Sequence, residues 1–298
     1  MNNDYHPRRT MLYVPAHNPR NIEKSRLLPT DSIIFDLQES VPPSEKANAR
    51  KVLKEAFAQS ADFGHSERVL RVNPLGSKWN NDDIALIQEL EIDAVMFPSI
   101  ESKAQILQAI EEIDFNAKKK LDLMINIETP LGVLKAEEIA GASDRISCIV
   151  LGTTDLGNEL KIGPAPDRLG LLTSLSLVIL AARAHKRCVV DGPHLELKDI
   201  QTCEFSCRQA RDLGFDGKAV IHPVQLKYTN DAFTPKRDDV NRAQRIIAAI
   251  NEAQSKGKSS AVLDDRLIEP GLEEWANRII SLYDKVHEIG QSDLVGAE

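Results

Sequence analysis

The sequence predicts an α/β protein built as a (β/α)8 TIM barrel with a C-terminal helical extension. Two observations support this prediction: short, apolar, β-branched runs recur along most of the chain, and helical patterns fill the intervals between them. Eight such units within roughly 230 residues match the usual size of a TIM barrel better than that of an open doubly wound sheet. No G-x-G-x-x-G loop follows the first run, which argues against a dinucleotide-binding fold.

The apolar runs are nearly continuous rather than alternating, as is typical of parallel strands that are covered on both faces. We predict strands at 11–15, 32–37, 68–72, 94–98, 121–127, 146–151, 187–190 and 218–221. Between them we predict helices at 43–58, 82–90, 102–113, 134–140, 169–185 and 204–213. Strand and helix therefore alternate throughout the first part of the chain.

A different pattern follows the eighth strand. We expect an amphipathic helix over 237–255, a mobile Gly/Lys/Ser linker over 255–260, an extended stretch over 262–268 and a helix over 272–289. The sequence thus divides into a catalytic barrel, residues 1–255, and a C-terminal segment, residues 256–298. That segment is predicted to serve as a lid or in oligomerisation.

The composition argues against two classes of binding partner, nucleic acid and membranes. The chain has 298 residues, 42% of them hydrophobic and 28% charged, and a formal net charge of -8. An acidic balance disfavours general binding to nucleic acid or to anionic membranes, because both need a basic face. No run approaches the ~20 apolar residues of a membrane span, and no signal-peptide core stands at the N-terminus. We therefore expect a cytoplasmic protein that binds neither nucleic acid nor membrane.

Polar residues stand where most of the predicted strands end. Barrel enzymes build their active sites from side chains at this rim, so the pattern locates the candidate site. The strand-end groups are Asp36 to Glu39, Arg71 to Asn73, Glu128, Asp155, Asp191 and His222. Charged groups gathered at the ends of buried strands would repel one another or be desolvated unless a metal or a substrate paired them.

Glu128 and Asp155 end neighbouring predicted strands, so their carboxylates can point into a common volume. Two hard oxygen ligands with room for water suit Mg²⁺, although each residue could equally be a helix cap or half of an ion pair. Arg71 is expected to project from its strand end, where a guanidinium can grip a carboxylate, or to pair with Glu39 or Glu128.

Basic residues suited to a nucleotide phosphate are predicted near the same rim. They are Arg9, Arg20 and Lys24. Because surface Arg and Lys occur on any protein, this signal is weak by itself.

Seven motifs, in order along the chain, resemble those of the citrate lyase β-subunit-like family within the HpcH/HpaI aldolase and citrate lyase superfamily. They are RTMLYVPA from Arg9, FDLQESVPP from Phe35, RVNPLGS from Arg71, IETPLG from Ile127, GTTDL from Gly152, GFDGKAVIHP from Gly214 and FTP from Phe233. An ordered set of this kind is far more specific than any single motif.

The resemblance implies a TIM barrel that binds Mg²⁺ through Glu128 and Asp155 and holds a substrate carboxylate or carbonyl group with Arg71. It also implies a CoA thioester substrate of the malyl, citramalyl or citryl type, and assembly as a homotrimer or hexamer. The family's proton donor is an Asp near the C-terminus that often comes from a neighbouring subunit, and Glu269 occupies its place here. Glu39 joins Arg71 and Glu269 as a catalytic candidate.

Four positions depart from the family pattern. The family's D-L-E-D reads Asp36-Leu-Gln38-Glu39 in this chain, so one carboxylate is replaced by an amide and the next is one methylene longer. Ser99 stands where a Lys is common, and Glu269 replaces the Asp. Each change alters charge or reach near the expected metal and substrate.

Together these features predict a Mg²⁺-dependent lyase that cleaves a small carboxylated β-hydroxyacyl-CoA into an acyl-CoA and a keto acid or aldehyde acid. The same catalyst run backwards would be a condensing enzyme. Three alternatives stay open: a malyl-CoA-type thioesterase, a CoA-independent 2-keto acid aldolase that uses the same metal, and a non-catalytic relative that binds CoA esters. Analysis of the products separates the thioesterase from the lyase.

Overall fold

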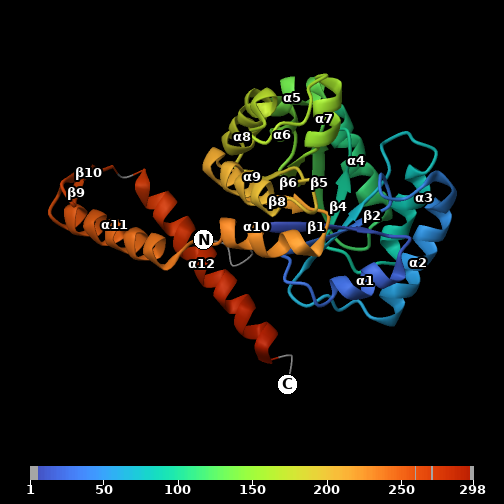
Figure 1. Cartoon of the computed structure of the whole chain (residues 1–298), viewed down its shortest axis with the longest axis horizontal. Helices are drawn as coiled ribbons and strands as arrows, with labels where there is room; N and C mark the ends of the chain where they lie inside the picture. The colour runs from blue at the N-terminus through green and yellow to red at the C-terminus, as the bar shows by residue number, and fades with distance from the viewer. Residues whose placement is uncertain (1–5, 259, 270, 296–298) are drawn as a thin grey trace. The chain divides into compact units, whose positions relative to one another are not determined.

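The computed structural model describes residues 6–258, 260–269 and 271–295, and its central feature is a closed barrel of eight parallel strands (Figure 1). The strands pair in sequence order, and β8 closes the barrel against β1. The predicted (β/α)8 barrel is thus confirmed. The strands are β1 Thr10–Pro15, β2 Ser32–Asp36, β3 Glu67–Arg71, β4 Ala94–Phe97, β5 Asp122–Ile127, β6 Ile146–Leu151, β7 Cys188–Asp191 and β8 Gly217–Val220.

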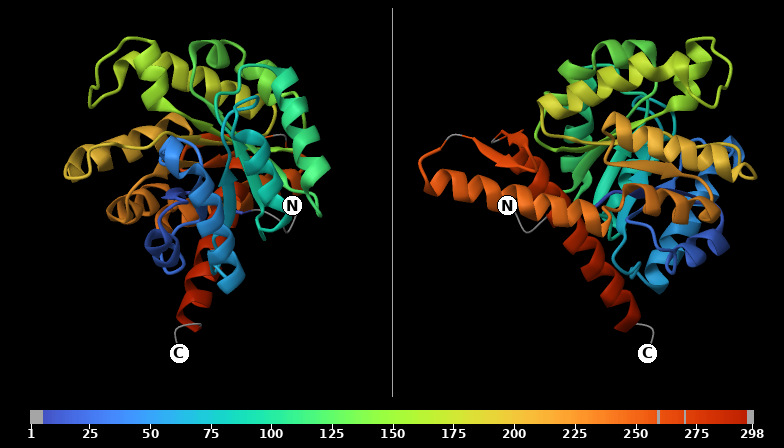
Figure 2. Two further views of the ribbon diagram at one scale, coloured as in Figure 1. Left: turned by 90° about the vertical axis from the view of Figure 1, so that its right-hand side faces the viewer. Right: turned by 60° about the vertical axis from the view of Figure 1, so that its left-hand side comes forward.

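Helices surround the strands of the barrel, as the two views of Figure 2 show. They are α1 Pro19–Ser25, α2 Lys46–Gln59, α3 Asn80–Ala85, α4 Lys103–Asn116, α5 Pro130–Leu134, α6 Ala136–Ala140, α7 Thr153–Glu159, α8 Leu172–Ala184, α9 Ile200–Leu213 and α10 Leu226–Phe233. Short 3₁₀ turns lie at Pro43–Glu45, Leu86–Gln88, Leu169–Leu171 and Pro223–Gln225. Four short helices, α1, α5, α7 and α10, were not predicted from the sequence.

Side-chain caps fix where several of these helices begin. Asn18, Ser102, Thr129 and Asp199 each accept a hydrogen bond from a backbone N–H in the first turn of the helix that follows. Such caps satisfy donors that have no partner within the helix. The caps therefore set the point at which the chain turns from a strand end into the covering helix.

Two apolar layers hold the barrel together. Alternate residues of the strands, among them Met11, Ile34, Val69, Met124 and Val190, form a fully buried cluster inside the barrel. Their neighbours in sequence belong to a larger cluster between the strands and the helices. Because side chains alternate across a strand, membership of one cluster tells which way a strand-end residue faces.

A polar pair lies at the amino ends of the strands. The Nη2 of Arg8 lies 2.6 Å from Oε1 of Glu67, and its Nε donates to Oε2 at 2.8 Å. The hydroxyl of Ser32 donates to Oε2 of the same carboxylate at 2.8 Å. Burial opposes the charge of Arg8, but the adjacent Glu67 raises the pKa of the guanidinium well above its usual value. The pair, with the apolar cluster above it, fills the barrel from this end.

Gly217 is required where β8 meets β1. A Cβ at this position would lie 1.8 Å from the carbonyl oxygen of Arg8, which is backbone and cannot rotate away. We expect Gly217→Ala to lower the free energy of unfolding by about 2–4 kcal/mol, because the seam between the strands must open. Urea unfolding measures this, with Gly163→Ala as the control, since nothing lies within 4 Å of a Cβ there. Equal midpoints for the two variants would contradict the argument.

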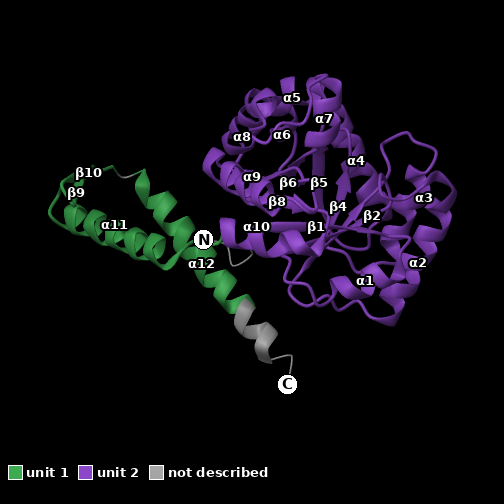
Figure 3. Cartoon of the chain, viewed as in Figure 1, with its two compact units in different colours: residues 1–7, 234–298 green, residues 8–233 purple. Residues whose placement is uncertain are grey.

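The chain divides into two compact units, Arg8–Phe233 and a second unit that contains the chain from Thr234 onward (Figure 3). The boundary lies after Phe233, whereas the linker composition placed it at residue 255. The reason is tertiary packing: α11, Arg237–Ser255, packs against α12, Leu272–Val295, around Ile246, Ile250 and Ala276.

The stretch predicted as extended forms a hairpin in the second unit. β9, Ala261–Leu263, pairs antiparallel with β10, Arg266–Ile268. Asp264 and Asp265 connect them with φ of 51° and 59°, the backbone signature of a type I′ turn, which matches the twist of a hairpin. Among the residues described, no helix has both the length and the apolar character needed to cross a bilayer.

Candidate active site at the carboxyl ends of the strands

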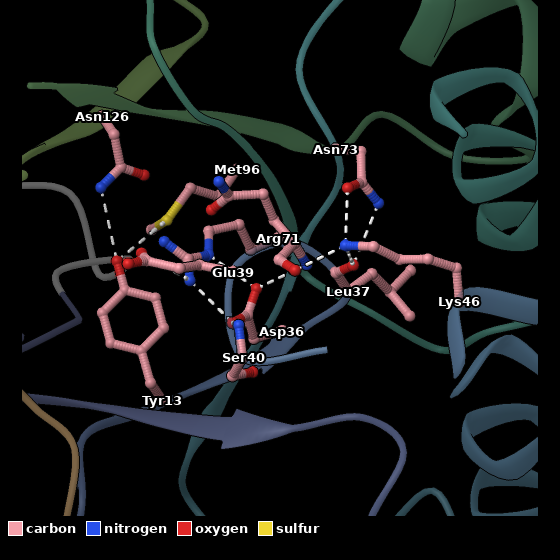
Figure 4. A network of polar contacts seen from close by, with 11 residues as sticks. Tyr13, Asp36, Leu37, Glu39, Ser40, Lys46, Arg71, Asn73, Met96 and Asn126 are labelled. Carbon is pink, nitrogen blue, oxygen red and sulfur yellow. Dashed lines mark hydrogen bonds and ion pairs between the residues drawn. The ribbon is translucent and has the colours of Figure 1, made fainter. Parts of the chain in front are cut away.

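An ion pair between Arg71 and Asp36 forms the centre of the rim (Figure 4). The Nε and Nη2 of Arg71 donate to the two oxygens of Asp36, both at 2.7 Å. Asp36 is fully buried, and its oxygens also accept from the backbone N–H groups of Gln38 and Ser40. Burial works against the charge of Asp36, but Arg71 outweighs it and lowers the pKa of the carboxyl. The same contact raises the pKa of Arg71 despite its burial.

The position of this pair follows from strand alternation. Ile34 and Val69 point into the barrel, so Asp36 and Arg71, two residues further along β2 and β3, point inward as well. The two residues are also register partners in neighbouring strands. The ion pair is therefore built into the barrel rather than into a loop.

Tyr13, in the second half of β1, packs on the guanidinium of Arg71. The Cζ of Arg71 lies 4.4 Å from the centre of the Tyr13 ring, within range of a cation–π interaction. The Tyr13 hydroxyl contacts the Asn126 amide at 3.4 Å and the Met96 sulfur at 3.8 Å. Burial raises the pKa of Tyr13, so the phenol stays protonated. Arg71 is thus held by Asp36 along one edge and by an aromatic face.

Lys46 fixes the loop that carries Glu39. Its Nζ donates to the carbonyl oxygens of Leu37 and Gln38 at 2.7 and 2.5 Å, and to Oδ1 of Asn73 at 2.8 Å (Figure 4). Burial lowers the pKa of Lys46. With two carbonyls tied to α2, the loop after β2 has little freedom to move.

Glu39 lies beside the ion pair and is largely exposed. Its Oε2 is 3.9 Å from Nη2 of Arg71, and 59% of its side chain is accessible to solvent. Partial burial, followed by repulsion from Asp155, raises the pKa of Glu39. It is therefore a carboxylate that takes up a proton more readily than an ordinary glutamate.

Glu128 is buried directly after β5 and is held from two sides. Its Oε1 accepts a hydrogen bond of 2.6 Å from the hydroxyl of Ser99. On its other side, a Cβ added to Gly152 would lie 2.3 Å from the Glu128 Cβ, so only glycine fits there. Burial is the main cause that raises the pKa of Glu128, and the charges of Asp155 and Glu39 add to it.

Asp155 stands in the first turn of α7, three residues after Gly152, and is partly buried. Asp155 and Arg71 both act electrostatically on Glu39 and on Glu128. Asp36 already engages Arg71. These hard oxygen donors at negative potential fit a divalent cation such as Mg²⁺, which keeps part of its water shell. Among the residues described, no group of three His, Cys, Asp or Glu side chains could hold a metal ion, so a cation here would rest on two carboxylates and water.

Asp191 belongs to a different layer from the groups above. Its neighbour Val190 packs inside the barrel, so Asp191 points outward beneath the helices. It binds Nη1 of Arg168 at 2.7 Å and Nζ of Lys218 at 2.5 Å, and it is fully buried. Asp191 therefore acts as the centre of a buried ion cluster, in spite of its position at a strand end.

Two further candidates remain, one in the barrel unit and one in the second unit. His222 caps the turn Pro223–Gln225 by accepting from the N–H of Val224 at 3.2 Å. Glu269 is exposed directly after β10 and belongs to the second unit, so the barrel unit alone does not contain it.

Arg9 corrects one expectation. It precedes β1, at the amino ends of the strands, and its Nε and Nη2 bind the two oxygens of buried Asp31 at 2.8 and 2.6 Å. The prediction that Arg9 contributes a phosphate contact at the rim is wrong, because its guanidinium is buried in this pair. Arg20 and Lys24 lie exposed on α1.

Four residues of the site were not identified from the sequence: Tyr13, Lys46, Ser99 as a partner of Glu128, and Asp36 as the partner of Arg71. Alternation was the one available signal for Asp36, since it shares a strand face with Ile34 as Arg71 does with Val69. Nothing in the sequence marks Lys46 or the contact of Ser99 with Glu128, because these contacts join separate segments of the chain.

Comparisons with known proteins show sequence similarity along most of the chain. The model of the HpcH/HpaI aldolase/citrate lyase family matches residues 9–223. A (3S)-malyl-CoA thioesterase of Cereibacter sphaeroides is 40% identical over 264 residues, which covers 89% of this chain and 90% of the relative. The citrate lyase subunit beta of Leuconostoc mesenteroides is 33% identical over 294 residues, 96% of each chain.

Solved structures show the same likeness. The CitE protein of Mycobacterium tuberculosis, in complex with magnesium, acetoacetate and coenzyme A, matches with a TM-score of 0.76 and 25% identity. The match covers 93% of this chain and 98% of that one. A citrate lyase beta subunit from the same organism, complexed with oxaloacetate and magnesium, matches with a TM-score of 0.65 and 27% identity over 77% of this chain and 98% of that one.

Proposed function

Because the chain belongs to the HpcH/HpaI aldolase/citrate lyase family, we propose that it is a Mg²⁺-dependent lyase that cleaves the carbon–carbon bond of a small carboxylated β-hydroxyacyl-CoA. The observation that carries the proposal is that Asp155 and the constrained guanidinium of Arg71 both act electrostatically on Glu39 and Glu128 at the rim, with Glu39 3.9 Å from Arg71. The magnesium and coenzyme A in the complex of the Mycobacterium tuberculosis CitE protein support the choice of metal and substrate class.

Arg71 binds the carboxylate of the substrate in this proposal. The Nε and Nη2 of Arg71 are bound to Asp36, so a ligand would meet the guanidinium through Nη1. Because Asp36 and Tyr13 already hold the side chain in place, binding orders little further and the carboxylate is oriented as it binds.

Glu128 and Asp155 would hold Mg²⁺, with water or substrate oxygens at its other positions. When bound, the metal would supply positive charge at the hydroxyl and carboxylate oxygens of the substrate. The two residues come from the end of β5 and the first turn of α7, and Gly152 between them leaves space for the Glu128 side chain.

Two carboxyl groups would move protons during cleavage. The β-hydroxyl loses its proton, the carbon–carbon bond breaks, and the electron pair stays on the thioester fragment, which then takes up a proton at carbon. Glu39 suits the first transfer, because its raised pKa makes it a stronger base than an ordinary glutamate. Glu269 is proposed as the acid that protonates carbon, supplied from the C-terminal segment of the same or a neighbouring copy within a homotrimer or hexamer.

Thioester hydrolysis is the second candidate. The (3S)-malyl-CoA thioesterase relatives, at 40% identity, favour it, because they share more of this sequence than the citrate lyase beta subunits do. The same substrate-binding and metal-binding groups would serve, with water attacking the thioester carbon in place of carbon–carbon cleavage.

Product analysis tests the two candidates together. Purified protein is incubated with Mg²⁺ and malyl-, β-methylmalyl-, citramalyl- or citryl-CoA, and the products are separated by mass. We expect an acyl-CoA and a keto acid or aldehyde acid, with no free thiol. Free CoA and the intact hydroxy acid would show hydrolysis, and no turnover of any substrate would contradict both candidates.

Magnesium affinity should depend on pH at values above the range in which an ordinary glutamate side chain titrates. The pKa of Glu128, a proposed ligand, is raised, so protons compete with Mg²⁺ at a higher pH than they do at an ordinary carboxylate. The pKa of Glu39 is also raised, so its negative charge is lost early as the pH falls. We expect affinity to fall as the pH is lowered from about 7.5 to about 5.5, with proton release on binding. Calorimetry in buffers of different ionisation enthalpy measures both. A constant affinity across this range would contradict the prediction.

A further inference from the structure

The chain after β4 is joined to the end of β5 by three successive contacts. The Ser99 hydroxyl donates to Oε1 of Glu128 at 2.6 Å, and the N–H of Ile100 donates to the carbonyl of Asn126 at 3.1 Å. The Thr129 hydroxyl then donates to Oε1 of Glu101 at 2.7 Å. Glu128 therefore sits in a junction of two loops whose relative position is fixed.

Ser99 adopts a backbone conformation that favours glycine. Its φ is 55°, in the left-handed region, where a side chain crowds the backbone. Such a residue persists only where its surroundings hold it, and strain of this kind gathers at functional sites. Glycine would relieve the strain but would lose the hydroxyl that reaches Glu128.

The Ser99 contact gives the two carboxylate oxygens of Glu128 different surroundings. Oε1 is taken by the hydroxyl, while Oε2 lies on the side of Gly152, where an added Cβ would come within 2.5 Å of it. Gly152 leads directly into α7, which carries Asp155 in its first turn. The oxygen that Ser99 leaves unused is thus the one on the side of the second carboxylate.

We propose that Ser99 is a positioning residue that makes Glu128 a one-oxygen ligand, with Oε2 directed to a divalent cation shared with Asp155. The inference rests on the proposed metal site and adds a selectivity. Mg²⁺ is small and favours one oxygen from each carboxylate, whereas Ca²⁺ readily takes both oxygens of a carboxylate. By occupying Oε1, Ser99 favours Mg²⁺ over Ca²⁺.

Calorimetric titration with MgCl₂ and with CaCl₂ tests the inference on the wild type, Ser99→Ala and Ser99→Gly. Both variants should bind Mg²⁺ about 10-fold more weakly, as is usual when a group that orients a ligand is removed. Their ratio of Mg²⁺ to Ca²⁺ affinity should fall, because Oε1 is released. Ser99→Gly should melt no lower than the wild type, since its backbone suits glycine.

Two control variants separate this role from effects of the backbone or of a lost hydroxyl. Lys186→Gly removes another left-handed side chain, with φ of 55°, in the turn before β7. Ser176→Ala removes an exposed hydroxyl on α8. Neither control should alter the affinity for either cation.

The outcomes distinguish this inference from the function on which it rests. If the wild type binds no Mg²⁺, the proposed metal site fails and the role of Ser99 fails with it. If the wild type binds Mg²⁺ and Ser99→Gly retains both its affinity and its preference over Ca²⁺, the metal site stands and the inference about Ser99 is overturned.

Discussion

Replacement of Glu128 by glutamine is expected to reduce Mg²⁺ affinity and turnover by at least about 100-fold while leaving the metal-free protein as stable as the wild type. The loss of binding follows from removing a charged oxygen ligand, since even groups that only orient a ligand contribute 10–100-fold. The unchanged stability follows from the raised pKa of Glu128, which shows that the metal-free fold disfavours its charge.

The raised pKa of Glu128 determines whether the substitution stabilises or destabilises the fold. A carboxyl whose pKa is higher in the folded state than in the unfolded state destabilises the fold once the pH rises above its unfolded pKa. At neutral pH the neutral Glu128→Gln should therefore unfold at an equal or higher urea concentration than the wild type in chelator. Added Mg²⁺ should stabilise the wild type and not the variant.

Glu138→Gln is the matched control, because Glu138 is an exposed glutamate on α6. It should bind Mg²⁺ and turn over substrate as the wild type does. Wild-type turnover by Glu128→Gln in the presence of Mg²⁺ would remove the basis of the proposed mechanism.

Loss of Arg71 is the second large effect that we expect, because it removes the substrate clamp and leaves a buried charge. In Arg71→Met the fully buried Asp36 keeps its charge without a counterion, and breaking such a pair costs about 3–5 kcal/mol. Adding Asp36→Asn should recover much of this stability. It should not recover activity, because no guanidinium is present for the substrate.

Urea unfolding and steady-state kinetics on the two single variants and the double variant measure this cycle. Arg9→Met is the matched control, since Arg9 forms a comparable ion pair with buried Asp31. It should lose stability, while the kcat of its folded fraction stays near that of the wild type. Equal activity in Arg71→Met and Arg9→Met would mean that Arg71 is structural alone.

The strands could be predicted from the sequence because each one is buried on both faces. The runs at 11–15, 32–37 and 146–151 agree with β1, β2 and β6 to within one residue, and β7 was predicted one residue early at each end. The short helices α1 and α7 were missed because they have too few turns to show a periodic pattern. The helix α11 was predicted with its correct bounds, but its place in the second unit was not, because that depends on packing against α12.

The charged residues at the strand ends were predictable, but Tyr13, Lys46 and the pairing of the charged groups were not. The strand-end signal marked Asp36, Arg71, Glu128 and Asp191 alike, yet three of them belong to the rim and Asp191 faces the helices. Only the inward or outward phase of each strand separates these cases, and that phase is visible once the inner cluster is known. The left-handed turn at Ser99 has no sequence signal, since no glycine stands there.

The Arg8–Glu67 pair and the apolar cluster above it have a consequence for the path of substrate and products. They fill the interior of the barrel from the amino ends of the strands, so the site is reached from the carboxyl ends. A substrate that is cleaved at this rim must therefore arrive on the carboxyl side of the barrel, and both of its fragments must leave on that same side.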